Sequence, residues 1–282
     1  MIVIVAVLGA VIACLLAVIA VLGTRLRHTG ERTERTVAAV RGEQSSLEAR
    51  AADLQRSNAE LEQFAYLASH DLQEPLRKVA SFCQLLQRRY AGKLDARADQ
   101  YIEFAVDGAK RMQALINDLL AFSRVAQSTP RPSLVSSDTA LAQARTNLAQ
   151  EVEKYGATIE AGHLPLVLAE LPLLTAIFQN LLSNALKFSG TAPPRVVVSA
   201  IRTGTMWQFS LTDFGIGIDP RDADRIFVLF QRLNERSAYP GTGVGLAMCK
   251  KIVEYFGGRI WLDTASEGTR FCFTLPGEPD DD

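Results

Sequence analysis

The stretch Gly241-Thr242-Gly243-Val244-Gly245 leads directly into a segment, residues 244–256, that we predict to be a helix. Alternate glycines before a helix expose backbone N–H groups and the positive end of the helix dipole, which suits binding of a triphosphate. The three glycines are therefore candidate phosphate-binding residues. This pattern alone is also compatible with a flexible loop, so other segments of the chain are needed to distinguish the two interpretations.

A second glycine segment, D-F-G-I-G at 213–217, follows a strand that we predict near residues 207–213. Gly215 and Gly217 allow the backbone to approach a flat ligand closely, and the Asp213 carboxylate can accept a hydrogen bond from an exocyclic amine. The letters D-F-G also occur in eukaryotic-type protein kinases. This chain lacks their H-R-D and V-A-I-K segments, and it lacks a G-x-x-x-x-G-K-[ST] loop.

Two asparagines and a lysine share one face of a helix predicted at about residues 171–188. Asn180 and Asn184 are four residues apart, and Lys187 follows one turn later. Carboxamide oxygens and an ammonium group on one face can hold Mg²⁺ and phosphate oxygens. A solvated polar stripe is the alternative, but apolar neighbours on both sides indicate a helix that is packed into protein.

The segment S-H-D-L-Q-E-P-L-R at 69–77 contains one of only three histidines in the chain. The heptad count places His70 at the outermost position, facing solvent. Asp71 beside it can orient the imidazole and stabilise its charge during nucleophilic attack. An exposed histidine is usually only solvated, so this site depends on the other three segments for support.

A seven-residue pattern runs from Val37 towards Leu86 and indicates a coiled coil. A break at Gly92 precedes a second predicted helix, Asp95 to Ala126, with the same three-and-four spacing of apolar residues. A helical hairpin with an apolar stripe cannot bury that stripe alone. We therefore expect two copies to form a four-helix bundle, which makes the protein a homodimer.

The first segment, Ile2 to Gly23, is apolar and uncharged, and its length matches the roughly 20 residues that a transmembrane helix needs. A cleaved signal peptide is the alternative, but no basic residue precedes the stretch, whereas several arginines follow it. The positive-inside rule then places the rest of the chain in the cytoplasm. We expect a single-pass anchor in the cell inner or plasma membrane.

The chain has 282 residues and a formal net charge of -1, so no global field indicates binding to nucleic acid. Its four cysteines have no metal-ligand spacing. Beyond a linker at Thr129 to Ser133, helices and strands mix, and we predict an α+β domain. The last residues, 278–282, are polar and expected to be disordered.

In this order, the segments resemble motifs of the bacterial sensor histidine kinases of two-component systems, in the bacteriophytochrome-like subgroup. H-D-L-Q-E-P-L-R is similar to the H box, Q-N-L-L-S-N-A-L-K-F to the N box, and D-F-G-I-G-I and G-T-G-V-G-L to the two glycine boxes. R-I-F-V-L-F-Q-R at 225–232 resembles the F box, and E-G-T at 267–269 a shortened last glycine box. The resemblance covers about Leu47 to Pro276.

The apolar run and the heptads predict a transmembrane anchor (1–23) and a coiled-coil linker (24–60). The resemblance implies a dimerisation and phosphoacceptor hairpin (61–128) and a Bergerat-type ATP-binding α/β sandwich (129–277). It implies that His70 is phosphorylated from ATP and passes the phosphoryl group to the receiver domain of a separate response regulator. Asp213 would bind the adenine amine, and Asn184, with Asn180, would hold Mg²⁺. Thr269 would contribute to the nucleotide pocket.

Three positions depart from the family pattern. Phe214 stands where the family usually has Asn, and Ser266 replaces a common glycine. Glu74 stands where many relatives have the Thr or Asn that the family ties to dephosphorylation of the regulator. Two other functions remain open alternatives: a non-catalytic, membrane-tethered dimeric scaffold with a vestigial nucleotide pocket, and an ATPase related to the mismatch-repair and heat-shock chaperone families.

Overall fold

The computed structural model describes residues 71–127, 131–233, 239, 241–264 and 268–278, with isolated positions between 44 and 69. The chain divides into two compact units, Met1–Leu61 and Glu62–Asp282. The predicted apolar anchor (residues 2–23), nearly all of the coiled coil and His70 lie outside the described residues. Within the described ranges, no helix is both long and apolar enough to cross a membrane.

The second unit begins with a helical hairpin. One helix covers residues 71–90, and α2 covers Ala96–Gln127. The turn between them is held by Asp99, whose Oδ2 accepts the Gly92 N–H at 2.9 Å, and Gly92 has a positive φ of 72°. Small and branched apolar side chains, Leu76, Ala80, Val106 and Ala109, are buried in the hairpin. The Gln73 side chain also donates to Asn117 Oδ1 across the two helices at 2.9 Å.

An α+β domain follows the hairpin, and its main sheet has five strands in the order β2-β4-β5-β7-β6. The strands are β2 (Thr158–Ala161), β4 (Arg195–Thr203), β5 (Met206–Asp213), β6 (Ile260–Asp263) and β7 (Thr269–Pro276). β2 and β4 are parallel, and the other pairs are antiparallel. A small second sheet pairs β1 (Ser133–Ser136) with β3 (Leu166–Ala169).

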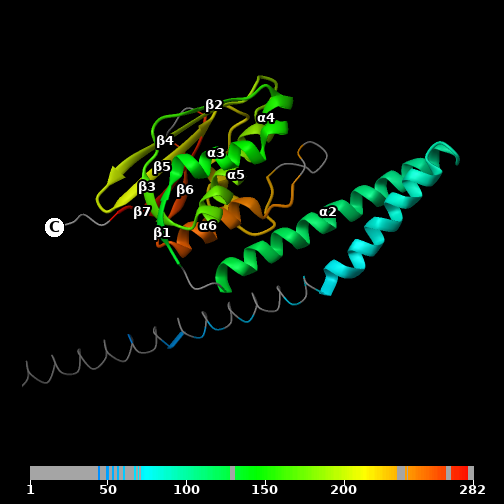
Figure 1. Ribbon diagram of the computed structural model, residues 1–282, viewed down its shortest axis with the longest axis horizontal. Helices are drawn as coiled ribbons and strands as arrows, with labels where there is room; N and C mark the ends of the chain where they lie inside the picture. Colours follow the sequence, from blue (N-terminus) through cyan, green and yellow to red (C-terminus); the bar gives the residue numbers. More distant parts are fainter. Residues whose placement is uncertain are drawn as a thin grey trace, which may run out of the picture. The chain divides into compact units, whose positions relative to one another are not determined.

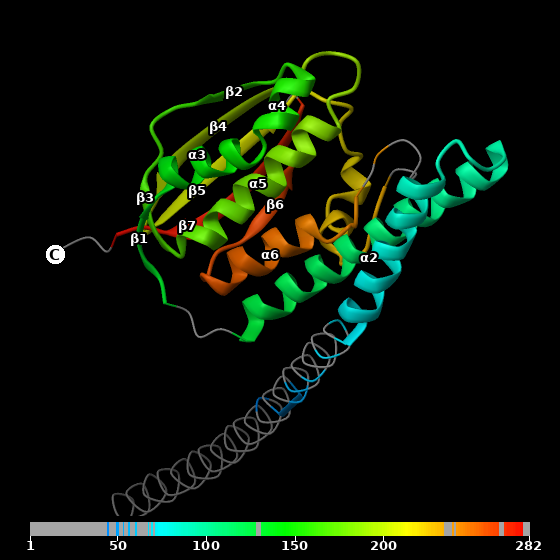
Figure 2. The ribbon, with the colours of Figure 1, turned by 45° about the vertical axis from the view of Figure 1, so that its right-hand side comes forward.

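Helices cover one face of the five-stranded sheet (Figures 1 and 2). These are α3 (Ser137–Asn147), α4 (Ala149–Tyr155), α5 (Leu171–Lys187) and α6 (Gly245–Tyr255). The core between the two layers is aromatic: Phe209 and Phe273 stack with ring centroids 4.8 Å apart, and Phe178 of α5 meets both rings edge-on. This packing fixes α5 on the sheet and so positions its polar face.

Two local features differ from the sequence-based expectation. The helix predicted near residues 138–155 is divided at Leu148, whose φ of -105° is not helical, into α3 and α4. Strands β1 and β3 were not predicted, because each has only four residues and a period-two pattern of that length carries little information. The remaining helices and strands of the domain lie where the sequence places them, within a few residues.

Candidate nucleotide-binding site

A cavity of about 970 Å³ lies between α5, the two glycine segments and the end of the hairpin. It is lined by nine of the ten residues that the sequence suggested for nucleotide binding. These nine are Asn180, Asn184, Lys187, Asp213, Gly217, Gly241, Gly243, Gly245 and Thr269. They come from four separate parts of the chain, so the fold brings together residues that only their type and local spacing had indicated. The tenth, Gly215, lies beside the cavity.

Asp213 ends β5 and is 6% exposed. Burial raises the pKa of its carboxyl group to about 6, although hydrogen bonds from the Gly215 N–H and the Thr269 side chain act in the opposite direction. Gly215 is required next to it, since a Cβ there would lie 2.1 Å from the carbonyl oxygen of Phe188. The Asp213 carboxylate is therefore a hydrogen-bond acceptor that lines the cavity but is almost completely shielded from water.

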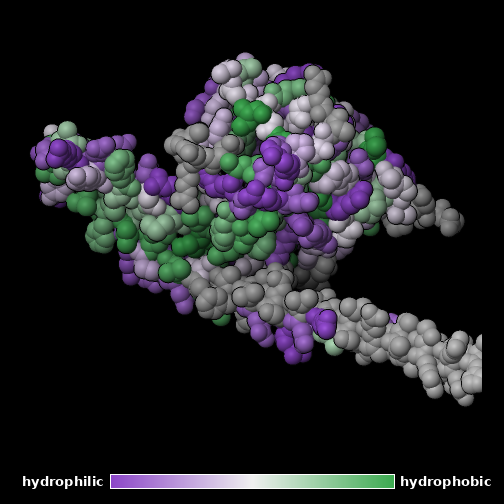
Figure 3. Space-filling model, turned by 180° about the vertical axis from the view of Figure 1, so that it is seen from behind, coloured by the Kyte–Doolittle hydropathy of each residue, from purple (hydrophilic) through white to green (hydrophobic). Residues whose placement is uncertain are grey.

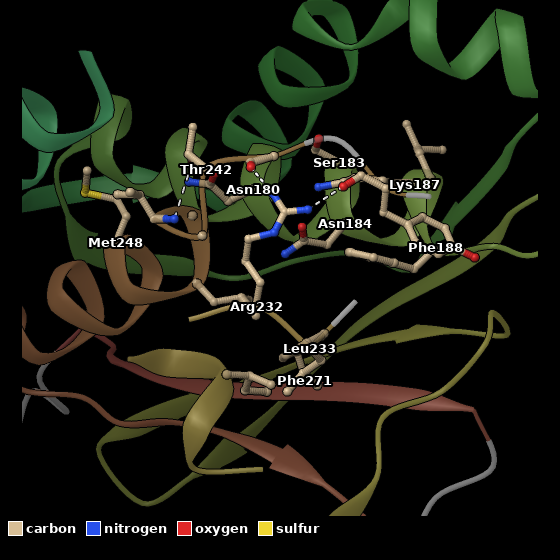
Figure 4. A pocket seen from close by; sticks show the side chains of 18 of the residues that line it. Asn180, Ser183, Asn184, Lys187, Phe188, Arg232, Leu233, Thr242, Met248 and Phe271 are labelled. Carbon is tan, nitrogen blue, oxygen red and sulfur yellow. Dashed lines mark hydrogen bonds between the residues drawn. The ribbon is translucent and has the colours of Figure 1, made fainter. Parts of the chain in front are cut away.

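The polar face of α5 forms another wall of the cavity (Figure 4). Asn180 donates through Nδ2 to the carbonyl oxygen of Ala176 at 3.0 Å, and its Oδ1 lies towards the start of α6. A Cβ on Gly245 would come within 2.9 Å of that oxygen, so glycine permits the close approach of α5 and α6. Asn184 lies one turn further along the same face.

Two positively charged side chains, those of Lys187 and Arg232, line the cavity. Burial, together with the nearby Arg232 guanidinium, lowers the pKa of the Lys187 ammonium group. Arg232 donates to the carbonyl oxygen of Gly241 and, at 2.6 Å, to that of Tyr239. Figure 4 shows Arg232 between the labelled side chains of α5 and Phe271 of the sheet. The sequence pattern suggested no role for Arg232 beyond its place in the R-I-F-V-L-F-Q-R segment, although a positive charge there suits an anionic ligand.

The glycine loop before α6 has a tightly packed shape that only glycine permits at Gly243. Gly243 has a φ of 78°, and a Cβ there would lie 3.0 Å from the backbone of Phe230 and Gln231. The Phe230 N–H donates to the Gly243 carbonyl oxygen at 3.0 Å, which ties the 225–232 segment to the loop. Gly243, Val244 and Gly245 line the cavity, so the start of α6, where backbone N–H groups lack helical partners, lies at the cavity. The Val244 N–H also donates to the Thr242 hydroxyl at 3.4 Å.

The hairpin supplies a wall that the sequence did not predict. Asp118, Ala121 and Val125 of α2 line the same cavity, and the Thr242 hydroxyl donates to Asp118 Oδ2 at 2.6 Å. These residues are more than a hundred positions apart in the chain, so no local pattern could connect them. The cavity is completed by tertiary packing between the hairpin and the α+β domain.

Phe214, which departs from the family pattern, is not among the residues that line the cavity. Its ring is 45% exposed and lies 5.3 Å from the guanidinium carbon of Arg195. Arg195 in turn forms a two-pronged ion pair with Glu160, at 2.9 and 3.1 Å. Phe214 therefore packs along the sheet.

The predicted phosphoacceptor, His70, lies outside the described residues. Asp71 is exposed and is the first residue of the described helix over 71–90. Among the described residues, no group of three or more His, Cys, Asp or Glu side chains could hold a metal ion. A metal at Asn184 would thus require ligands from phosphates and water, as Mg²⁺ commonly has.

A buried carboxylate, two positively charged side chains and a glycine loop around one cavity are the features expected of a nucleotide-binding domain. Comparisons with known proteins agree. Residues 169–279 match the family of histidine kinase-, DNA gyrase B-, and HSP90-like ATPases, and residues 60–128 match the His Kinase A (phospho-acceptor) domain.

Among similar proteins, Cyanobacterial phytochrome A of Nostoc sp. is 50% identical over 225 residues, which cover 79% of this chain and 29% of that protein. The phytochrome-like protein Cph1 of Synechocystis sp. is 45% identical over 227 residues, covering 80% and 30% of the two chains. The crystal structure of full-length ShkA with AMPPNP superposes with a TM-score of 0.59 at 26% identity, covering 76% of this chain and 45% of that one.

The chain therefore carries a histidine kinase phosphoacceptor domain followed by a histidine kinase-like ATPase domain, and it is similar to part of two phytochrome-like proteins. It spans about a third of the length of these two curated relatives.

Proposed function

We propose that this protein is a sensor histidine kinase that binds ATP in the cavity, autophosphorylates His70 and passes the phosphoryl group to an aspartate of a separate response regulator. The observation that carries the proposal is the position of Asp213. Its buried carboxylate lines a cavity that is also lined by the polar face of α5, two positively charged side chains and the glycine loop. This combination suits a ligand that carries both a flat, amine-bearing base and a polyanion.

In this proposal Asp213 accepts a hydrogen bond from the adenine amine, with Thr269 holding the carboxylate in place. Gly215 and Gly217 keep the backbone close to the base. Lys187, Arg232 and the N–H groups at the start of α6 contact the phosphates. Fixed donors around a polyanion provide most of what phosphoryl transfer requires, which is positioning and charge neutralisation.

The described residues fit a bound Mg²⁺ ion through the carboxamide of Asn184, supported by Asn180. When bound, the ion would neutralise charge on the phosphate oxygens. The His70 imidazole then attacks the γ-phosphorus, a nitrogen–phosphorus bond forms, and the bond to the β–γ bridging oxygen breaks to leave ADP. Asp71 orients the imidazole and stabilises its developing positive charge.

We propose a homodimer formed through the hairpin. A stripe of apolar side chains on the helix over 71–90, namely Leu72, Val79 and Leu86, is 46–56% exposed in the single chain. Tyr101 and Met112 of α2 are likewise exposed. Figure 3 shows hydrophobic surface gathered along the hairpin. Burying these side chains against a second copy would contribute about 25 cal/mol per Å² of apolar area.

The membrane location is part of the same proposal. It rests on the sequence of Ile2 to Gly23 and on the arginines that follow, which favour a single-pass anchor in the plasma membrane with the kinase in the cytoplasm.

The decisive experiment is to incubate the purified protein with γ-labelled ATP and to test the acid lability of the incorporated label, since phosphohistidine is acid-labile. His70→Ala should abolish labelling. His163→Ala is the matched control, because His163 is 93% exposed and lies in the α+β domain. Acid-labile phosphate that persists in His70→Ala, or is lost only in His163→Ala, would refute the assignment.

A further inference from the structure

The last third of α2 is packed onto the α+β domain. α2 runs beside α6 in both ribbon views (Figures 1 and 2). Val125 is 5% exposed and belongs to the hydrophobic core of that domain. The Lys251 ammonium of α6 lies 4.1 Å from the ring centroid of Phe122 on α2. The hairpin helix is thus attached to the α+β domain beside the cavity, which Asp118, Ala121 and Val125 of α2 help to line.

Asp118 connects this packing to the glycine loop. Its Oδ2 accepts the Thr242 hydroxyl at 2.6 Å, and the same hydroxyl lies 3.4 Å from the Val244 nitrogen at the beginning of α6. Thr242 stands between Gly241 and Gly243, where the proposed function requires phosphate oxygens. A carboxylate of this chain is therefore held at a loop whose geometry favours anions.

We infer that Asp118 is an internal competitor of the triphosphate, so that nucleotide binding displaces its carboxylate from Thr242 and weakens the attachment of α2 to the loop. The inference rests on the proposed function and adds to it a direct coupling between nucleotide binding and docking of the hairpin. Its physical basis is simple. Two anions near one small loop repel each other, and the repulsion is strong where protein replaces water.

The coupling must act in both directions. A change in the hairpin that moves α2 away from the domain removes Asp118 from the cavity and raises the affinity for nucleotide. Conversely, bound nucleotide lowers the free energy needed to release α2. Through Asp118, the affinity of the glycine loop for nucleotide would thereby depend on whether α2 is packed against the α+β domain.

The test is calorimetric titration of the full-length protein with magnesium and AMPPNP, and separately with adenosine, which lacks phosphates. Asp118→Ala should bind AMPPNP about fivefold or more tightly than the wild type, which corresponds to loss of one charge-assisted contact. Asp118→Asn, which keeps the shape but removes the charge, should show most of the same gain, because the repulsion between the two anions is lost in both variants. Adenosine affinity should be unchanged in both variants.

Asp107→Ala is the matched control: it removes an exposed carboxylate from the same helix, away from the cavity, and should change neither affinity. If wild type binds AMPPNP but the Asp118 variants bind it no more tightly, or gain equally for adenosine, the competition is refuted while the proposed function stands. If none of the proteins binds AMPPNP, both are refuted. Because Asp118→Asn preserves the packing volume, the test survives any folding defect of Asp118→Ala.

Discussion

Asp213 and Thr269 lie directly opposite each other across the antiparallel pair of β5 and β7, and the Thr269 side chain hydrogen-bonds the Asp213 carboxylate. The pairing register therefore joins Asp213 of the D-F-G-I-G segment to Thr269 of the E-G-T segment. Since both side chains are buried, 6% exposed each, the pair forms a fixed polar point in an otherwise apolar layer. This arrangement has consequences for both stability and binding.

The first prediction concerns pH. The pKa of Asp213 is raised to about 6 in the folded protein from 3.8. For a carboxyl group shifted upwards, the stabilising contribution is present below the unfolded pKa and is lost as pH rises through the folded pKa. The nucleotide-free protein should therefore lose up to about 3 kcal/mol of unfolding free energy from this group between pH 4 and 7. The unfolding free energy measured with urea across that pH range should fall less in Asp213→Asn than in the wild type.

The second prediction separates the two ends of the proposed ligand. Asn184→Ala should weaken AMPPNP binding about tenfold in magnesium but hardly at all in EDTA, because its role is exerted through the metal. Asp213→Ala should weaken binding in both conditions, because its role is towards the base. Asn117→Ala, on α2 outside the cavity lining, provides the control for loss of a carboxamide. If Asn184→Ala weakened AMPPNP binding equally in magnesium and in EDTA, Asn184 would not act through the metal.

The third prediction uses two glycines. A Cβ at Gly215 would lie 2.1 Å from the Phe188 carbonyl oxygen, whereas a Cβ at Gly162 would meet nothing within 4 Å. Gly215→Ala should destabilise the protein by about 1–3 kcal/mol through overpacking and should also weaken nucleotide binding. Gly162→Ala should be close to neutral. Thermal unfolding of the two variants, compared with the wild type, tests the backbone geometry beside the cavity.

The fourth prediction concerns the dimer. Val79→Glu should weaken self-association, because a charge in an apolar helix interface has no partner and keeps its desolvation cost. Leu166→Glu, at a residue that is 48% exposed on β3 of the α+β domain, should not. Sedimentation velocity over a range of concentrations distinguishes the two. Unchanged association of Val79→Glu would place the dimer contact elsewhere on the chain.

The features of the site that could be predicted from the sequence are those that depend on residues close together in the chain. The four-residue spacing of Asn180 and Asn184 and the glycines before α6 are local, and the structure brings them to one cavity as predicted. The wall made by Asp118 and its contact with Thr242 depends on packing between distant segments, which no periodicity reveals. Arg232 also needed the fold, because only there does its guanidinium lie beside Lys187.

The last prediction concerns dephosphorylation of the regulator. A hydroxyl or carboxamide four residues after the phosphorylated histidine can orient water for attack on an aspartyl phosphate, but this chain has Glu74 there. The carboxylate is 66% exposed and pairs with Lys78 at 2.9 Å. An exposed ion pair of this kind contributes little to stability and does not cancel the charge of Glu74, so repulsion of the incoming phosphate persists, though salt reduces it.

We therefore expect autokinase activity with weak phosphatase activity. When the protein and ADP are added to purified phosphorylated regulator, phosphate loss should scarcely exceed the regulator's own rate, and Glu74→Thr should accelerate it. Rapid loss with the wild type that Glu74→Ala abolishes would instead make Glu74 a participant in the hydrolysis.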